Sequence, residues 1–458
     1  METKTKSGKI SAKADMKPTG DKPVNAPVAD NGVDLSQFRF DGENIYFYNH
    51  SKGHFQKVSR HLELITVARL AGNTLNVKQL REAVEEIKLT PEIFWTPKVP
   101  NSNLWLVQED GSAFNILTKE CKRSTPEDNA RWNFNFKFNA DAEWGQAPNF
   151  CRFVRSSVGF DLLKSGDGGE KRKLLLQMIV YMCSNLFGIK GMFVVIGNPS
   201  SGKSQLLNLL RLIVGVENCA AMTLSDCASR FRSSLLEDIH CIINDELPCA
   251  GVKNLDQLKK LICNEFLTIE RKGKDVKSYK PVCKLLYAGN QLPILAEYDS
   301  GNAFAKRLKV LRFPNSIPEE DWDFEICEKM YAERDAIVSS AIKESEEFIA
   351  NLRLAEDPDG AEIVASYMAE NDSVRTFTEN KIWCRTDKKN PNLKTYLTKL
   401  YDRYVKYCEA NSLTACSVYV FRQQLAQNGF RFSKLRAEKG GAPKASVLGI
   451  EIAEVSHE

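Results

Sequence analysis

GMFVVIGNPSSGKSQLLNLL, residues 191–210, decides the fold that we expect of this chain. Residues 192–196 form a short apolar, β-branched run, which indicates a buried strand. Residues 197–204 match the pattern G-x-x-x-x-G-K-[ST] in full, and the leucines that follow supply the buried side of a helix. A strand, a glycine-rich loop and a helix in this order predict a phosphate-binding loop.

The residue types of this loop suit the binding of a nucleoside triphosphate. Its backbone N–H groups can point inward at phosphate oxygens, and the helix N-terminus adds a positive field. Lys203 can reach the β- and γ-phosphates, and the Ser204 hydroxyl can ligate Mg²⁺. The alternative is a chance turn that holds no phosphate, which the order of strand, loop and helix disfavours. We expect ATP and Mg²⁺, with the nucleotide held by Gly197, Asn198, Pro199, Ser200, Ser201, Gly202, Lys203, Ser204 and Gln205.

Composition bounds the class of protein. A length of 458 residues allows about three domains, and 43% hydrophobic with 27% charged residues is ordinary for a globular protein. A net charge of +4 is too small to indicate nucleic-acid binding, which must depend on local patches. The thirteen cysteines include no C-x-x-C pair, so we expect buried thiols in a reducing compartment and no zinc site.

The most apolar region, residues 174–196, is interrupted by polar side chains, which favours a buried helix and strand over a membrane span. The N-terminus lacks the apolar core of a signal peptide. We therefore expect a soluble, intracellular protein without membrane contact.

The composition and hydrophobic periodicity of the sequence predict five segments. Residues 1–35 have the composition of a disordered tail. Short strands and an amphipathic helix over 36–150 predict a small α+β domain. A helical lead-in and alternating strands and helices over 151–355 predict the ATPase domain, with a parallel sheet. Residues 356–392 predict a helical and linker segment, and 393–458 a further domain.

That last segment, 393–458, contains two amphipathic helices followed by two strand-like runs. Helices followed by a basic hairpin look like a winged helix, whose second helix can enter a groove of DNA. Phosphate contacts from the hairpin would come from Lys434, Arg436, Lys439 and Lys444. A winged helix used for protein contacts is the open alternative.

Residues 241–246, CIINDE, form an apolar strand that ends in two carboxylates. Hydrolysis of a triphosphate needs one acid to hold the hydrated Mg²⁺ and another to polarise the attacking water. Asp245 fits the first role and Glu246 the second. The next buried strand, 284–288, ends near Asn290, whose amide can hydrogen-bond the γ-phosphate or the attacking water.

Between the acid pair and that strand lies a basic segment. Residues 267–284 predict a β-hairpin that can grip a phosphate backbone, although a solvated turn can be equally basic. The DNA-binding candidates are Lys260 on the preceding helix and Arg271, Lys272, Lys274 and Lys277 in the hairpin. Further along, Lys306 and Arg307 precede a strand, where an arginine can reach a neighbouring subunit's nucleotide. We choose Arg307 because lysine is the poorer bidentate partner for phosphate.

The order of GNPSSGKS, CIINDE, the basic segment 259–280, YAGNQLP and AFAKRLKVLRFP resembles helicase superfamily 3, in particular the ATPase half of phage-, plasmid- and poxvirus-type primase–helicases. The resemblance extends over roughly residues 70–440. It implies an α/β, AAA+ P-loop ATPase with a parallel sheet core, preceded by a small α+β and helical region and followed by a winged-helix-like domain. It also implies a hexameric ring that threads single-stranded DNA and moves 3′ to 5′.

From this resemblance we expect an ATP-dependent replicative DNA helicase of a phage or mobile element, located in the cytoplasm of a bacterial host. Its partners would be single-stranded and forked DNA, other copies of itself and a separate primase. An initiator or loader that hydrolyses ATP without processive unwinding fits the same motifs. A small-molecule P-loop kinase fits poorly because it needs neither the basic hairpin nor the C-terminal domain. A protein-interaction role in anti-phage defence is a further alternative.

Overall fold

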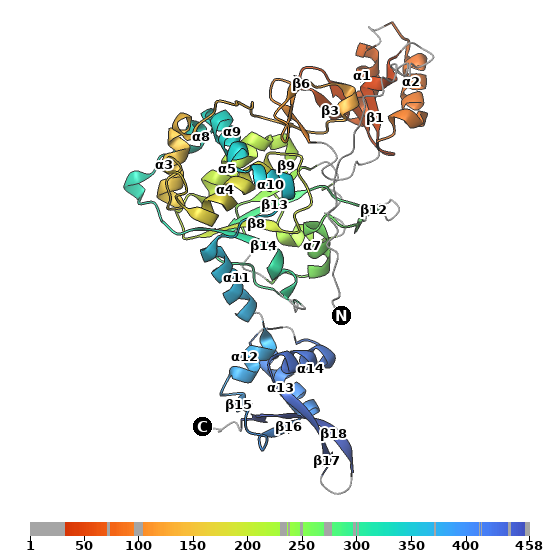
Figure 1. Cartoon of the computed structure of the whole chain (residues 1–458). Coiled ribbons are helices and arrows are strands. Elements are labelled where there is room, and N and C mark those ends of the chain that lie inside the picture. The colour runs from red at the N-terminus through yellow and green to blue at the C-terminus, as the bar shows by residue number, and fades with distance from the viewer. Residues whose placement is uncertain are drawn as a thin grey trace, which may run out of the picture. The chain divides into compact units, whose positions relative to one another are not determined.

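The structure is a computed structural model that describes residues 33–70, 74–95, 104–229, 236, 239–247, 251–269, 277–295, 299, 302–370, 372–411, 413, 415–437 and 441–453 (Figure 1). Contacts divide the chain into two compact units. The smaller ends at Pro97, and the larger contains the phosphate-loop sequence. Among the described helices, none has the length and apolarity needed to cross a membrane.

The smaller unit has a three-stranded sheet and two helices. Phe38–Phe40 in β1 pairs antiparallel with β2, and the sheet order is β1-β2-β3. The helix expected from the amphipathic pattern begins with a capping box, in which Asn76 and Gln79 each accept a hydrogen bond from the other's backbone N–H. This helix is α2 (Val77–Leu89). The other elements of the smaller unit are β2 (Ile45–Asn49), β3 (His54–Lys57) and α1 (Glu63–Leu70).

The next four strands belong to the larger unit, although the sequence assigns them to a domain that ends at residue 150. Strands β4 and β5 pair antiparallel on either side of Asp110 and Gly111. Phe114 and Phe134 are fully buried in the same core as Phe193 of the phosphate-loop strand, so this segment has no separate core. The smaller compact unit ends at residue 97, before these strands. The strands are β4 (Trp105–Gln108), β5 (Ser112–Asn115), β6 (Cys121–Arg123) and β7 (Asn133–Phe134).

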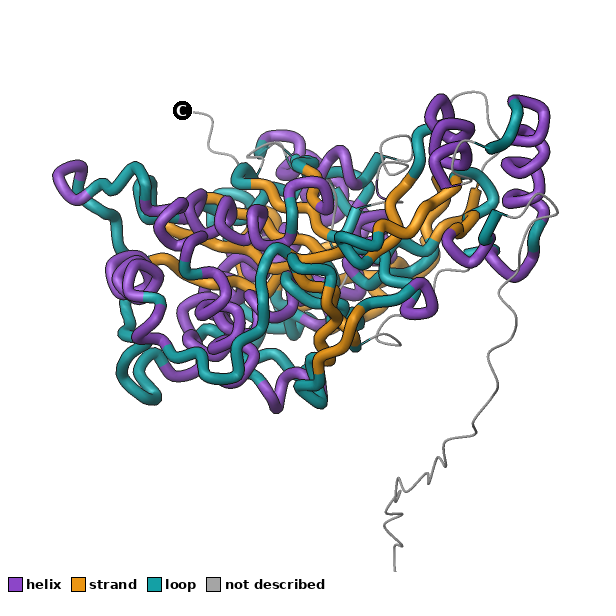
Figure 2. The backbone as a smooth tube through the Cα atoms, turned by 90° about the horizontal axis from the view of Figure 1, so that it is seen from above, coloured by secondary structure: helices purple, strands orange, loops and turns teal. Residues whose placement is uncertain are grey.

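A five-stranded, all-parallel sheet forms the centre of the larger unit (Figures 1 and 2). Its order is β14-β8-β13-β10-β9. The α/β class expected from the alternating pattern is therefore confirmed. The strands are β8 (Met192–Gly197), β9 (Cys219–Ala220), β10 (Cys241–Asn244), β13 (Lys284–Gly289) and β14 (Leu308–Phe313).

Apolar side chains cover both faces of this sheet, as is usual for parallel strands. Phe193 and Val195 point into one core, whereas Met192 and Val194 point into another, which follows from the two-residue period of a strand. The first core includes residues of α3 (Pro148–Ser157), α4 (Gly169–Met182), α5 (Lys203–Val214), α8 (Ile326–Ala332), α9 (Arg334–Glu344) and α10 (Glu346–Asn351). The second includes residues of α6 (Leu224–Cys227), α7 (Leu255–Ile262) and α11 (Pro358–Glu370). The apolar region 174–196 is thus a buried helix and a strand, as predicted.

The C-terminal helices and strands have their own hydrophobic core. That core begins at Val374 rather than at residue 393, because Phe377 packs against Tyr404 and Phe421, with ring centroids 5.6 and 6.3 Å apart. Two sheets, β16-β18-β17 and β15-β19, complete it. Its elements are α12 (Ser373–Glu379), β15 (Cys384–Thr386), β16 (Lys394–Tyr396), α13 (Leu397–Ala410), α14 (Val418–Gln427), β17 (Arg431–Ala437), β18 (Gly441–Leu448) and β19 (Ile450–Ile452).

Candidate nucleotide-binding site

The phosphate loop links β8 to α5 and depends on two close backbone approaches. A Cβ atom on Gly197 would lie 2.4 Å from the carbonyl oxygen of Phe313 in the adjacent strand. Gly202 has a φ of +85°, and a Cβ atom there would lie 2.7 Å from Phe153 and from the hydroxyl of Ser157. Only glycine fits both positions without displacing α3 or β14. The neighbouring elements therefore fix the curve of the loop.

Lys203 folds back over this loop. Its ammonium group donates to the carbonyl oxygens of Gly197 at 2.9 Å and Asn198 at 2.6 Å, and to the hydroxyl of Ser201 at 3.3 Å. Partial burial lowers its pKa. The ammonium group thus lies at the loop itself, where it can exchange carbonyl oxygens for phosphate oxygens.

The strand order brings the predicted polar side chains to one edge of the sheet. Strand β13 lies between β8 and β10, with Gly289 opposite Ile196 and Tyr287 opposite Asn244. Parallel strands lie about 4.8 Å apart, so the ends of β8 and β10 are roughly 10 Å apart with the end of β13 between them. The exposed side chains that follow these strands are Asp245 and Glu246 after β10 and Asn290 after β13.

Hydrogen bonds fix the end of β10, the strand that leads into Asp245 and Glu246. The buried side chain of Asn244 accepts a hydrogen bond from the backbone N–H of Glu246 at 2.9 Å. Arg211 of α5 donates to the carbonyl oxygen of Ile243 at 3.0 Å. The helix that begins with Lys203 is therefore tied directly to the strand that carries the two acids.

The donor set fits Mg²⁺. Within the described part of the chain, no group of three or more His, Cys, Asp or Glu side chains could hold a metal ion alone. Mg²⁺ in nucleotide sites keeps several waters and takes one or two protein ligands together with substrate phosphates. The hydroxyl of Ser204, in the first turn of α5, and the carboxylate of Asp245 are hard oxygen donors of this kind.

Arg307 is not part of this edge. It ends the short helix η9 (Ala305–Arg307) and precedes β14, whose first residue pairs with the first residue of β8. Six strand residues of about 3.3 Å each separate it from the loop, a span of roughly 20 Å. Its guanidinium donates to the Sγ of Cys263 at 3.1 Å and to the carbonyl oxygen of Ala303, while Lys306 is exposed. Within one chain, the structure does not bring Arg307 to the phosphate loop.

The basic hairpin is described only in its arms. Strands β11 (Leu267–Ile269) and β12 (Lys277–Tyr279) pair antiparallel, as predicted. Lys260 is exposed on α7, and Lys277 is the first residue of β12. Arg271, Lys272 and Lys274 lie outside the described residues.

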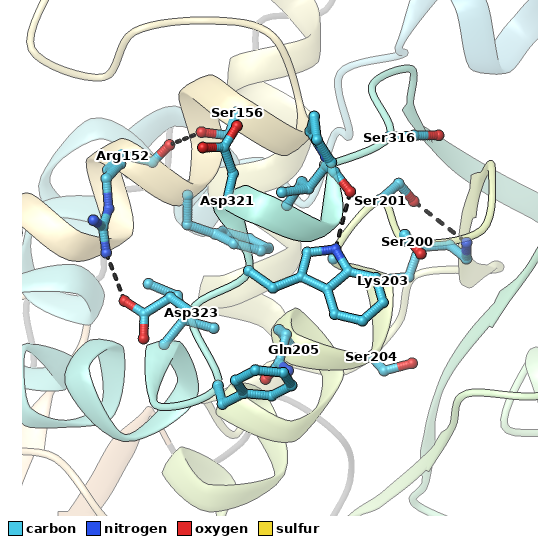
Figure 3. A pocket seen from close by; sticks show the side chains of 17 residues that line it. Arg152, Ser156, Ser200, Ser201, Lys203, Ser204, Gln205, Ser316, Asp321 and Asp323 are labelled. Atoms are coloured by element: carbon cyan, nitrogen blue, oxygen red, sulfur yellow. Dashed lines mark hydrogen bonds and ion pairs between the residues drawn. The ribbon is translucent and has the colours of Figure 1, made fainter.

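Two cavities flank the phosphate loop. One, of about 680 Å³, is lined by residues that include Asn198, Asn290 and Arg312. The other, of about 660 Å³, lies against Ser200–Gln205 and also includes Phe153 of α3 and residues 316–326 (Figure 3). The sequence does not single out this second wall, because its aromatic residues lie in an acidic stretch that is typical of a solvated turn.

Comparisons with known proteins add one family match. A model described as a family of unknown function (DUF5906) matches residues 195–307, which include the loop, the acid pair, Asn290 and Arg307. A search of curated proteins finds no match.

Three similar solved structures are described as apo structures of the NrS-1 C terminal region. One A form is 13% identical, with a TM-score of 0.47, and the match covers 90% of this chain and 95% of that chain. A second A form, of residues 305–718, is 12% identical, with a TM-score of 0.45 and coverage of 90% and 96%. The third is 13% identical, with a TM-score of 0.45 and coverage of 90% and 95%.

Proposed function

We propose that this chain is an ATP-dependent DNA helicase of the AAA+ type, a replication protein of a phage or other mobile element. The observation that carries the proposal is the meeting of the phosphate loop, Asn290 and the acid pair Asp245–Glu246 at the carboxyl edge of β8, β13 and β10. Ligands of open α/β sheets bind at this edge. The three groups supply phosphate binding, polarisation of water and contact with the γ-phosphate.

In the proposed reaction, the loop N–H groups and Lys203 hold the triphosphate. Glu246 orients a water molecule, whose oxygen bonds to the γ-phosphorus while the bond to the β–γ bridging oxygen breaks, giving ADP and inorganic phosphate. Ser204 and Asp245 would hold Mg²⁺, which would supply charge neutralisation at the phosphates. Asn290 contacts the γ-phosphate or the attacking water.

The position of Arg307 supports assembly into a ring. It lies at the amino edge of the sheet, opposite the loop. When copies are arranged with the amino edge of one against the carboxyl edge of the next, each Arg307 meets its neighbour's triphosphate. The arginine then stabilises charge that develops on the transferred phosphoryl group.

Two regions support DNA as the partner. Strands β11 and β12 pair on either side of residues 270–276, whose basic side chains the sequence predicts to contact a phosphate backbone. In the C-terminal region, the helices α13 and α14 and the β17–β18 hairpin support the predicted winged helix. Exposed residues there that can contact DNA are Tyr419, Arg422 and Gln423 on α14 and Lys434 and Lys444 on the hairpin.

Strand displacement on forked DNA with a 3′ tail tests the proposal. We expect the wild type to separate the strands with ATP, and Lys203→Ala to have no activity. Lys190→Ala, which changes an exposed lysine shortly before β8, is the matched control and should unwind normally. Hydrolysis of ATP on DNA without strand separation would instead favour an initiator or loader, and ATP hydrolysis by Lys203→Ala at the wild-type rate would contradict the site.

A further inference from the structure

The cavity on the α5 side of the phosphate loop has an aromatic wall that the hydrolysis reaction does not use. This wall follows β14, and its backbone is tied to the loop, because the N–H of Ile317 donates to the carbonyl oxygen of Ser200 at 2.9 Å. Trp322 comes after the short helix η10 (Glu319–Asp321) and lines the cavity. Changes in loop position therefore move this wall as well.

The indole of Trp322 is held but not covered. Its Nε1–H donates to the carbonyl oxygen of Ile317 at 3.0 Å, so its polar atom is satisfied within the segment. The side chain is nevertheless 42% exposed. Phe324 is 84% exposed, and its ring meets the indole edge-on, with centroids 6.2 Å apart and planes at 88°. An amphipathic ring in this state can stack on a flat ligand.

An ion pair anchors the far end of the wall to α3. Arg152 donates to the carboxylate of Asp323 at 2.8 Å (Figure 3). Lys329 donates to both oxygens of that carboxylate at 2.8 and 2.9 Å. The hydrogen bond from Lys329 is the main cause of a lowered Asp323 pKa, and Arg152 adds to it. Since two cations balance this carboxylate, it adds little repulsion toward a bound polyphosphate.

The two cavities indicate in which orientation a triphosphate would lie along the phosphate loop. The cavity that holds Asn290 lies on the γ-phosphate side, because Asn290 follows the strand between the loop and the acids. The other cavity is lined by Ser204 and Gln205, one and two residues beyond Lys203. A triphosphate whose γ-phosphate faces Asn290 would place its nucleoside on this side, and about 660 Å³ is within the usual range for a small-ligand pocket.

We propose that Trp322 is the stacking platform for the nucleobase of the bound nucleoside triphosphate, with Phe324 closing the edge of the base site. This assignment rests on the proposed nucleotide site. Stacking accepts every base, since each has a π-face. The side chains of Arg152 and Asp323 are paired with each other rather than free to read a base edge. Since stacking is the contact proposed to hold the base, we expect weak discrimination, with ATP and GTP affinities within about tenfold of each other.

Isothermal titration calorimetry of the full chain tests this assignment, with adenylyl imidodiphosphate and inorganic tripolyphosphate as ligands in the presence of Mg²⁺. Trp322→Ala should weaken binding of the adenine nucleotide about tenfold or more and leave tripolyphosphate binding unchanged. Trp322→Phe keeps a ring but removes the hydrogen bond to Ile317, and it should restore most of the affinity. Phe266→Ala, which removes an exposed aromatic ring elsewhere, is the matched control.

Each result has one meaning. Unchanged nucleotide affinity in Trp322→Ala, or an equal loss for both ligands, would overturn the assignment, the second because it indicates a structural role for Trp322 in the loop. Failure of Trp322→Phe to restore binding would also overturn it, because the hydrogen bond and not the ring would be responsible. Wild-type affinity for both ligands in Lys203→Ala would overturn the proposed function itself, and the base site with it.

Discussion

Lys203 and Lys284 occupy opposite edges of the same sheet, and both donate hydrogen bonds to backbone carbonyl groups. Lys203 lies at the carboxyl edge and contacts its own loop. Lys284 begins β13 at the amino edge, is 2% exposed and donates to the carbonyl oxygens of Tyr181, in the last turn of α4, and of Ser184, just beyond that helix. The comparison teaches that carbonyl contacts alone do not identify a functional lysine. A functional lysine is identified by its access to a cavity at the edge of the sheet where ligands bind.

The surroundings of Lys284 also differ in kind. The rings of Tyr181 and Phe187 lie 4.5 and 4.6 Å from its ammonium group, and His240 is 3.5 Å away. Burial lowers the pKa of Lys284 to about 7 and lowers that of His240 well below its usual value. This edge is therefore a packed interior that holds α4 to the sheet, whereas the carboxyl edge is the one proposed to bind the nucleotide.

The largest effect that would sharpen this contrast is loss of hydrolysis in Lys203→Ala. We expect ATP turnover to fall to background, because both ground-state binding and transition-state charge stabilisation depend on the ammonium group. The free energy of unfolding should change by less than about 1 kcal/mol, since the described hydrogen bonds of this side chain are to its own loop. Phosphate release and urea denaturation measure the two quantities. A large loss of stability would assign Lys203 a structural role like that of Lys284.

Arg307→Ala should lower ATP hydrolysis about a thousandfold, as expected for an arginine that acts on a neighbour's nucleotide. Lys306→Ala, one residue earlier and exposed, is the matched control and should have a small effect. Mixing Arg307→Ala with Lys203→Ala chains should restore hydrolysis, because an intact loop then meets an intact arginine on the adjacent copy. Without recovery in the mixture, the lost contacts to Cys263 and Ala303 would explain the defect instead.

Replacing Arg271 and Lys272 together with alanine tests the hairpin. We expect the stimulation of hydrolysis by single-stranded DNA to disappear and unwinding to fail, because the phosphate backbone loses its cationic contacts. The affinity for a non-hydrolysable ATP analogue should stay within about twofold. Fluorescence anisotropy with labelled single-stranded DNA and calorimetry measure the two bindings. Unwinding at the wild-type rate would contradict the role of the hairpin.

The smallest effect concerns Lys284. Its pKa of about 7 in the folded chain lies below the usual 10.5, so the unfolded chain binds the proton more tightly. This group therefore makes stability rise as pH increases from about 7 toward 10, and it has no pH effect below that range. Between about pH 7 and pH 9, Lys284→Met should remove about 1–3 kcal/mol of this rise. Chemical denaturation across this pH range measures the free energy of unfolding, with Lys190→Met as the control. The same dependence of this free energy on pH in wild type and Lys284→Met would contradict the argument.

The sequence predicts the local parts of the site well. The loop, the acid strand and the strand that ends near Asn290 are continuous patterns, and the structure contains each of these elements. It does not predict the strand order, which alone places Asn290 between the loop and the acids. It also misses Trp322, because an isolated aromatic residue among acidic residues resembles a solvated turn until the hydrogen bond between Ile317 and Ser200 folds it back.

Which segments share a core is not predicted from the sequence, for a related reason. An apolar strand has the same period whichever core it joins, so Phe114 gives no sign that it packs with the five-stranded parallel sheet. Phe377 likewise lies in a segment that the sequence assigns to a linker, and its packing partners Tyr404 and Phe421 come many residues later. Such long-range choices depend on tertiary packing rather than on local pattern.

Strand β14 has one more consequence. Arg307 precedes it at one end, and the wall that carries Trp322 follows it at the other. In a ring, contact between Arg307 and a neighbour's triphosphate would displace β14. This displacement would reach the proposed base site of the subunit to which Arg307 belongs. Adjacent subunits would then bind and hydrolyse ATP in sequence. A Hill coefficient above about 1 for ATP turnover, lost in Arg307→Ala, would be the sign of this cooperativity.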